Sequence, residues 1–219
     1  MQRLFPHPAA LVGVRESYDV ARARPAHRPW IGVCMVASID GSTVIDQRST
    51  GLSSPADQEV LHTLRDLADM LIVGAGTVRA EGYGPPVKAG QRVGVVSRAG
   101  NLDLAAPLFT SGAGFLIVPH AAPPLPVPTI RAGSTDVDLA EALAQLDVDF
   151  VQAEGGALLN GALAEADVID ELNLTISPQL AGGDGPRLAT GAAPLGRRMQ
   201  LAHLLEDDGF LFTRYVRAR

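Results

Sequence analysis

The sequence predicts an α/β fold in which helices flank a mainly parallel central sheet that ends in an antiparallel C-terminal edge. Short apolar runs bounded by glycine, such as residues 70–73, are typical of strands buried on both faces. Helical patterns of about ten residues alternate with these runs, as expected between parallel strands. The late strand patterns follow one another without a helical pattern, which favours antiparallel pairing there.

Composition excludes several classes of function. The 219 residues are 47% hydrophobic and 19% charged, so the chain can bury a core. The net charge of −6, without a basic block, argues against nucleic-acid binding. No apolar run approaches the roughly 20 residues of a membrane-spanning helix, and no signal peptide opens the chain. We therefore expect a cytoplasmic protein that binds neither nucleic acid nor a membrane.

Cysteine and histidine usage argues against metal sites and hydrolytic chemistry. The single cysteine, Cys34, excludes an internal disulfide and a Cys-rich zinc site, and we expect it to be a buried packing residue. The five histidines show no metal-ligand spacing, so no metal is expected. The G-x-S-x-G, Walker and zinc-deaminase patterns are absent.

The chain divides into an extension and one domain. Residues 1–29 are rich in proline, arginine and alanine, and they predict an extension with at most one short helix, at 16–23. Residues 30–219 contain no convincing linker and predict a single domain. Its first strand is 30–37, and a turn containing Asp40-Gly41 follows.

The remaining elements alternate in type until the C-terminal region. Ser54 and Pro55 begin a helix that runs to about residue 67, with serine as the N-cap and proline in the first turn. Further strands are expected at 70–73, 92–97, 115–118, 148–153, from 168 to Pro178, and 210–216; further helices are expected at 137–146 and 157–166. A glycine loop, 182–185, separates the last two strand patterns.

Two glycine turns predict a phosphate-binding site. Each follows a strand and precedes a helix, and their sequences are Gly74-Ala75-Gly76-Thr77 and Glu154-Gly155-Gly156-Ala157. Both would lie at the carboxyl edge of a parallel sheet, where open α/β folds bind ligands. Thr77 is expected to start a helix, and two helix N-termini side by side can hold a pyrophosphate through backbone N–H groups.

A third strand end predicts which dinucleotide is bound. Ser97 and Arg98 supply a hydroxyl and a guanidinium group, which suit a 2′-phosphate and so favour NADPH over NADH. Neither glycine turn is the G-x-G-x-x-G fingerprint, so the prediction rests on the three strand ends together.

Five ordered motifs resemble the reductase domain of riboflavin biosynthesis. They are MVASIDG (35–41), a helix led by S-P and ending in L-R (64–65), LIVGAGTVRAE (71–81), EGGALLNGAL (154–163) and VIDELNLTISPQLAGGDG (168–185). The resemblance covers about residues 30–216 and implies a dihydrofolate-reductase-like fold. It also implies the NADPH-dependent reduction of 5-amino-6-(5-phosphoribosylamino)uracil by a homodimer. The deaminase domain fused to this reductase in many bacteria is not among these residues, so we expect a stand-alone reductase.

The resemblance also implies roles for individual residues. The NADPH contacts would be Gly51, Gly74, Gly76, Thr77, Ser97, Arg98, Gly155, Gly156, Ala157 and Leu158. Ser49, Arg65 and Lys88 would hold the ribose phosphate of the substrate, and Glu154 would reach its pyrimidine or ribitol side. Glu81 would handle or orient the proton at the reacting centre, and Asp40 would help to shape the same pocket.

Departures from the family pattern leave the substrate open. The family usually has T-V-x-x-D-[DN]-P, where this chain has Glu81-Gly82-Tyr83. Gly51 stands where a tryptophan is usual, and Lys88 replaces an arginine that could bind phosphate with two hydrogen bonds. Two alternatives therefore stay open: a reductase of another heterocycle, such as a dihydropterin or dihydrofolate, and a non-catalytic NADP(H)-binding protein.

Overall fold

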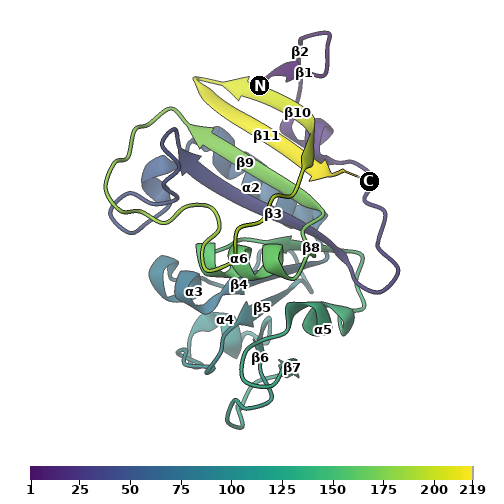
Figure 1. The fold of residues 1–219 in the computed structure, drawn as a ribbon, viewed down its shortest axis with the longest axis vertical. Helices are drawn as coiled ribbons and strands as arrows, with labels where there is room; N and C mark the ends of the chain where they lie inside the picture. Colours follow the sequence, from purple (N-terminus) through teal and green to yellow (C-terminus); the bar gives the residue numbers. More distant parts are fainter. Residues whose placement is uncertain (219) are drawn as a thin grey trace.

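An eleven-stranded sheet organises the computed structural model, which describes residues 1–218 (Figure 1). The strands are β1 (Gln2–Phe5), β2 (Ala10–Leu11), β3 (Trp30–Ser38), β4 (Met70–Gly74), β5 (Arg92–Val96), β6 (Gly114–Val118), β7 (Thr129–Arg131), β8 (Phe150–Ala153), β9 (Glu171–Ser177), β10 (Met199–Asp207) and β11 (Phe210–Arg217). Their spatial order is β2-β1-β10-β11-β9-β3-β8-β4-β5-β6-β7. Strands from both ends of the chain therefore meet at one side of the sheet.

The pairing confirms the predicted fold class. The strands from β9 through β3, β8, β4, β5 and β6 to β7 are all parallel to their neighbours. Beyond β9, the strands β11, β10, β1 and β2 pair antiparallel. The predicted antiparallel edge is present, and it contains the hairpin β10–β11 although the sequence pattern predicted only its second strand.

Helices lie on both faces of the parallel strands. They are α1 (Val14–Tyr18), α2 (Pro55–Leu67), α3 (Ala75–Glu81), α4 (Pro107–Thr110), α5 (Leu139–Ala144) and α6 (Ala157–Glu165), with a short 3-10 helix at Thr50–Leu52. The predicted start of α2 is confirmed, because the Ser54 hydroxyl accepts a hydrogen bond from the Asp57 amide at 3.1 Å. Helix α5 is shorter than predicted, and α4 and β7 were not predicted.

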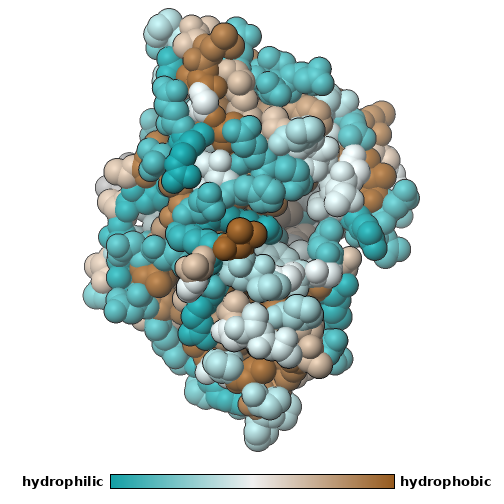
Figure 2. Space-filling model, turned by 180° about the vertical axis from the view of Figure 1, so that it is seen from behind, coloured by the Kyte–Doolittle hydropathy of each residue, from teal (hydrophilic) through white to brown (hydrophobic). Residues whose placement is uncertain are grey.

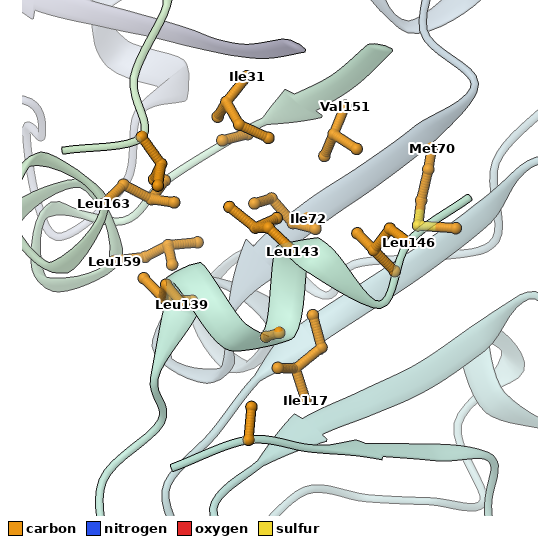
Figure 3. Packing of buried hydrophobic residues seen from close by; sticks show 14 of the residues in the cluster. Ile31, Met70, Ile72, Ile117, Leu139, Leu143, Leu146, Val151, Leu159 and Leu163 are labelled. Atoms are coloured by element: carbon orange, nitrogen blue, oxygen red, sulfur yellow. The ribbon is translucent and has the colours of Figure 1, made fainter. Parts of the chain in front are cut away.

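The largest core cluster joins α5 and α6 to one face of the sheet. Leu143 and Leu159, from the two helices, pack with Ile31, Ile72 and Val151 of neighbouring strands, as Figure 3 shows. All five side chains are at most 5% exposed. Helix α2 covers the opposite face, so the parallel strands are apolar on both sides and have the near-continuous hydrophobic runs seen in the sequence.

The secondary structure predicted for residues 1–29 was wrong. Two strands, β1 and β2, extend the sheet beyond β10, and the helix lies at Val14–Tyr18 rather than at 16–23. Short edge strands such as Gln2–Phe5 acquire their structure from the strand that they pair with, here β10. Local pattern alone therefore did not reveal them.

A buried ion cluster ties this extension to the sheet. Glu171 of β9 is fully buried and accepts hydrogen bonds from Arg22 at 2.9 and 3.1 Å and from Arg214 at 2.9 Å. Burial alone would raise the pKa of Glu171, but the two guanidinium groups outweigh it and lower the pKa to about 2. The carboxylate therefore stays charged and holds residues 20–22 against the sheet.

Replacing Glu171 by Gln is expected to destabilise the protein by about 3 kcal/mol at neutral pH, because two buried guanidinium groups lose their counter-charge. Urea unfolding measures this loss. The matched control is Asp66→Asn, whose ion pair with Arg15 at 3.8 Å is exposed, and we expect less than about 0.5 kcal/mol there.

The pH dependence of this effect follows from the lowered pKa. Glu171 contributes its stability above about pH 4.5, and the contribution is lost as the pH falls towards 2. The difference between the wild type and Glu171→Gln should therefore shrink over that range. A difference below about 1 kcal/mol at pH 7 would contradict the proposed tether.

Candidate functional site

A cavity of about 1410 Å³ opens at the carboxyl ends of the parallel strands. Its wall includes Gly74 at the end of β4, Ser97 after β5 and Glu154 after β8, together with residues of α2 and α3. This edge is where a parallel α/β sheet offers free strand ends and helix N-termini to a ligand. The sequence motifs that predicted a phosphate site therefore lie around one cavity.

The two glycine turns lie against each other at the centre of this edge. The Gly74 amide donates a hydrogen bond to the Gly155 carbonyl at 2.7 Å. A Cβ atom on Gly156 would lie 2.9 Å from the Thr77 hydroxyl oxygen, too close for an ordinary contact, and Gly155 has a φ of +75°. The absence of side chains here lets the two backbones meet and leaves room for a ligand beside them.

Each turn leads into a helix, although one helix starts earlier than predicted. Helix α3 begins at Ala75 with Gly74 as its N-cap, so Thr77 lies in the first turn and does not begin the helix. Helix α6 begins at Ala157 with Gly156 as its N-cap, as predicted. Gly76, Ala157 and Leu158 line the cavity next to these turns.

The third strand end provides the charged part of the cavity. Arg98 is exposed, and its Nε lies 2.6 Å from the Asp136 carboxylate. Ser97 is buried, and its hydroxyl oxygen accepts a hydrogen bond from the Gly100 amide at 3.0 Å. Arg79 of α3 also lines this part and donates to the Asn101 carbonyl at 3.1 Å. The sequence motifs did not indicate Arg79, because it lies on a helix surface like many solvated arginines.

A three-residue cluster, Arg65, Tyr83 and Glu154, forms another part of the cavity wall. Arg65 Nε and Nη2 donate to the two Glu154 carboxylate oxygens, each at 2.7 Å. The Tyr83 hydroxyl donates to Glu154 Oε2 at 2.5 Å and accepts from Arg65 Nη2 at 3.3 Å. The Glu154 side chain is 6% exposed and that of Arg65 32%. Tyr83 was visible in the sequence only as a departure from a family pattern.

Glu81 lies in the cavity wall with its carboxylate already hydrogen-bonded. The Ser49 amide and hydroxyl both donate to Glu81 Oε1 at 3.1 Å. Both residues line the cavity, so the structure brings together two site residues that were predicted for separate roles. Gly51 does not line the cavity, and its carbonyl accepts a hydrogen bond from the Gln179 side chain at 2.8 Å.

Asp40 and Lys88 lie outside the cavity wall, as do Gly51 and Gly155. Asp40 accepts hydrogen bonds from the Ser38 hydroxyl and from the amides of Ala181 and Gly182, and these bonds lower the pKa of Asp40 to about 2. Lys88 Nζ donates to the carbonyls of Asp66 and Ala68 at 2.7 and 2.8 Å. Asp40 therefore fastens the loop after β9.

Lys88 donates hydrogen bonds to backbone carbonyls at the end of α2. The carbonyls it binds belong to the helix terminus, where a cation complements the helix dipole.

Within residues 1–218, no group of three or more His, Cys, Asp or Glu could hold a metal ion. None of the helices in the described part of the chain is long and apolar enough to cross a membrane.

The family model for the RibD C-terminal domain matches residues 29–210. The chain belongs to the RibD C-terminal domain family. This assignment covers the whole parallel sheet and β10 but only the first residue of β11, and it confirms the resemblance stated from the five motifs.

Individual relatives of the RibD C-terminal domain family agree with this assignment. Two archaeal proteins named 2,5-diamino-6-ribosylamino-4(3H)-pyrimidinone 5′-phosphate reductase are similar to this chain. The Methanothermobacter thermautotrophicus protein is 27% identical over 73% of this chain and 82% of its own length. The Archaeoglobus fulgidus protein is 28% identical over 75% and 87%.

Solved structures show the same fold. A pyrimidine reductase-like protein from Corynebacterium diphtheriae superposes with a TM-score of 0.81 at 21% identity, covering 95% of this chain and all of that chain. A riboflavin biosynthesis reductase from Saccharomyces superposes with a TM-score of 0.70 at 17% identity, covering 90% of this chain and 93% of that chain. The predicted reductase fold of the RibD C-terminal domain family is thereby confirmed.

Lys88→Met is expected to lower the free energy of unfolding by about 1 kcal/mol, because the Asp66 carbonyl loses its side-chain donor and the Ala68 carbonyl keeps only the one from Gln91. The same variant should leave substrate and cofactor binding unchanged, since Lys88 does not line the cavity. Thermal melting and ligand titration measure the two effects.

The matched control for this substitution is Arg15→Met, which removes an exposed cation. Arg15 Nη1 lies 3.8 Å from the Asp66 carboxylate, so little stability is lost with it. A large rise in the substrate KM of Lys88→Met without loss of stability would return Lys88 to the substrate site.

Proposed function

We propose that this chain is an NADPH-dependent reductase of riboflavin biosynthesis that acts on a 5-phosphoribosylamino pyrimidine. The reaction converts 5-amino-6-(5-phosphoribosylamino)uracil, or the 2-amino pyrimidinone named for the archaeal relatives, to the ribitylamino product. The observation that carries the proposal is the pair of glycine turns that meet at the sheet edge, beside a cavity lined by two separate polar clusters.

The cofactor half of the proposal rests on the fit of a phosphorylated ligand to the turns. A Cβ atom on Gly156 would clash with Thr77, so this backbone stays bare and its N–H groups remain close to the cavity. Gly74, Gly76, Thr77 and residues 155–158 would hold the pyrophosphate through N–H groups and the threonine hydroxyl. Arg98, with Ser97 shaping the turn and Arg79 nearby, would bind the 2′-phosphate.

The substrate half rests on the polar groups of the cavity wall around Arg65. Arg65 Nη1 donates no hydrogen bond within residues 1–218, so it can donate to a substrate phosphate while Nε and Nη2 hold Glu154. Ser49, held by Glu81, would contribute a hydroxyl to the same ligand. NADPH, when bound, supplies the hydride that reduces C1′ of the ring-opened ribose. The chain's own contribution is to bind and orient the substrate for that transfer.

We also propose that the protein acts as a homodimer in the cytoplasm. On β9, Leu172, Leu174 and Ile176 alternate with buried polar residues and remain half-buried. The near face of β9, β10 and β11 in Figure 1 has no helix over it. Leu172 packs partly against the core, and we propose that a second copy covers Leu174 and Ile176. Seen from behind, the surface is largely polar with small apolar groups (Figure 2).

Steady-state NADPH oxidation tests the proposed reaction. We expect turnover with the ribosylamino pyrimidine phosphate and none with dihydrofolate, because a pterin offers no phosphate to Arg65 and no C1′ imine. Turnover of dihydrofolate alone would favour the alternative heterocycle reductase. Tight NADPH binding without turnover of either compound would favour a non-catalytic NADP(H)-binding protein.

Arg98→Ala is expected to weaken NADPH binding about tenfold or more and NADH binding less than about twofold, since a charge-assisted hydrogen bond to the 2′-phosphate would be lost. Fluorescence titration with each dinucleotide measures the two dissociation constants. The control is Arg24→Ala, an arginine outside the cavity wall that pairs with exposed carboxylates. Equal weakening of both dinucleotides by Arg98→Ala would remove the 2′-phosphate assignment.

A further inference from the structure

The Glu154 carboxylate has one acceptor position left over. A carboxylate offers about four lone-pair sites on its two oxygens. Oε2 accepts from Arg65 Nη2 and from the Tyr83 hydroxyl, whereas Oε1 accepts only from Arg65 Nε within residues 1–218. The Glu154 side chain lines the cavity and is only 6% exposed. The remaining acceptor position on Oε1 is therefore available only to a group inside the cavity.

The turn after α3 delivers Tyr83 to this carboxylate. Gly82 ends the helix in the left-handed conformation, with a φ of 63°, and reverses the chain. The Tyr83 ring then packs against the cluster of buried residues that includes Leu71, Val73 and Val95, and its centre lies 5.4 Å from the Arg65 guanidinium carbon. Burial, and then the neighbouring Glu154 charge, raise the pKa of Tyr83, so its hydroxyl remains a proton donor to Glu154.

Arg65 and Tyr83 together leave the carboxylate little freedom to turn. The bidentate pair with Arg65 fixes the carboxylate plane, and the bond from Tyr83 fixes which oxygen keeps the open site. Without the hydroxyl, both oxygens would offer an open site and the plane would be held by Arg65 alone. The hydroxyl therefore has a role in directing Glu154, whose charge is balanced by Arg65.

We infer that Tyr83 is a positioning residue that acts through Glu154 and makes this carboxylate a fixed acceptor for a ring N–H or amino group of the pyrimidine. This inference rests on the proposed function and deepens it by naming the substrate edge that the site reads. A carboxylate held in this way favours a hydrogen-bond donor and disfavours a ring carbonyl, because an unpaired buried acceptor is costly. Tyr83 thus takes a role at the point where the chain departs from its family pattern.

A double-mutant cycle tests whether Tyr83 acts through Glu154. The four proteins are the wild type, Tyr83→Phe, Glu154→Gln and the double variant, each assayed with saturating NADPH and varied pyrimidine substrate. Tyr83→Phe should raise the substrate KM about tenfold, change kcat less than twofold and leave the NADPH dissociation constant unchanged. In the Glu154→Gln background the same substitution should change KM less than about threefold, because the coupled partner is already altered.

The same KM measurements provide a control variant and the outcomes that would contradict the inference. Tyr215→Phe removes a tyrosine hydroxyl from β11, away from the cavity wall, and should leave KM unchanged. An unchanged KM for Tyr83→Phe, or an equal rise in both backgrounds, would overturn the inference. If Tyr83→Phe melts too early to assay, Glu154→Gln decides alone, and an unchanged KM there also overturns it. Failure of the proposed function is seen separately, as absence of turnover by the wild type.

Discussion

The contact between two glycine turns is the constraint on which the site depends. The 2.7 Å hydrogen bond from the Gly74 amide to the Gly155 carbonyl joins the ends of β4 and β8, which are neighbours in the sheet. Any side chain at Gly156 would push Thr77 away. Because α3 and α6 both start at this contact, their N-termini lie next to each other, and the polar clusters of Arg98 and Arg65 line the same cavity.

Much of the fold could be predicted because its parallel strands are buried on both faces. Their apolar runs are continuous, and α2 carries its own start signal in Ser54 and Pro55. The extension could not be predicted in the same way, because β1 and β2 are short and obtain their structure by pairing with β10. The ion cluster at Glu171 joins residues 149 positions apart, a contact that no local pattern contains.

The candidate site was predictable to the extent that backbone chemistry defines it. Glycine turns after strands can be located in sequence, and Gly74, Gly76, Gly156 and Thr77 line the cavity as that pattern suggests. Charged side chains were harder to place, because sequence identifies the group and not its partner. Lys88 caps a helix and Asp40 fastens a loop, although the family resemblance suggested that Lys88 holds the substrate phosphate and that Asp40 shapes the pocket.

The cluster of Arg65, Glu154 and Tyr83 explains why the departure at residues 81–83 is compatible with a working site. Glu81, longer by one methylene than the usual aspartate, reaches the loop at Ser49 and holds it beside the cavity. Gly82 then turns the chain so that Tyr83 occupies the position opposite Glu154. The segment that differs most from the family pattern therefore supplies two anchors, one for Ser49 and one for Glu154. Ser49 and Glu154 both line the cavity, so under the proposed function the departure bears on which substrate is held and leaves the glycine turns unaltered.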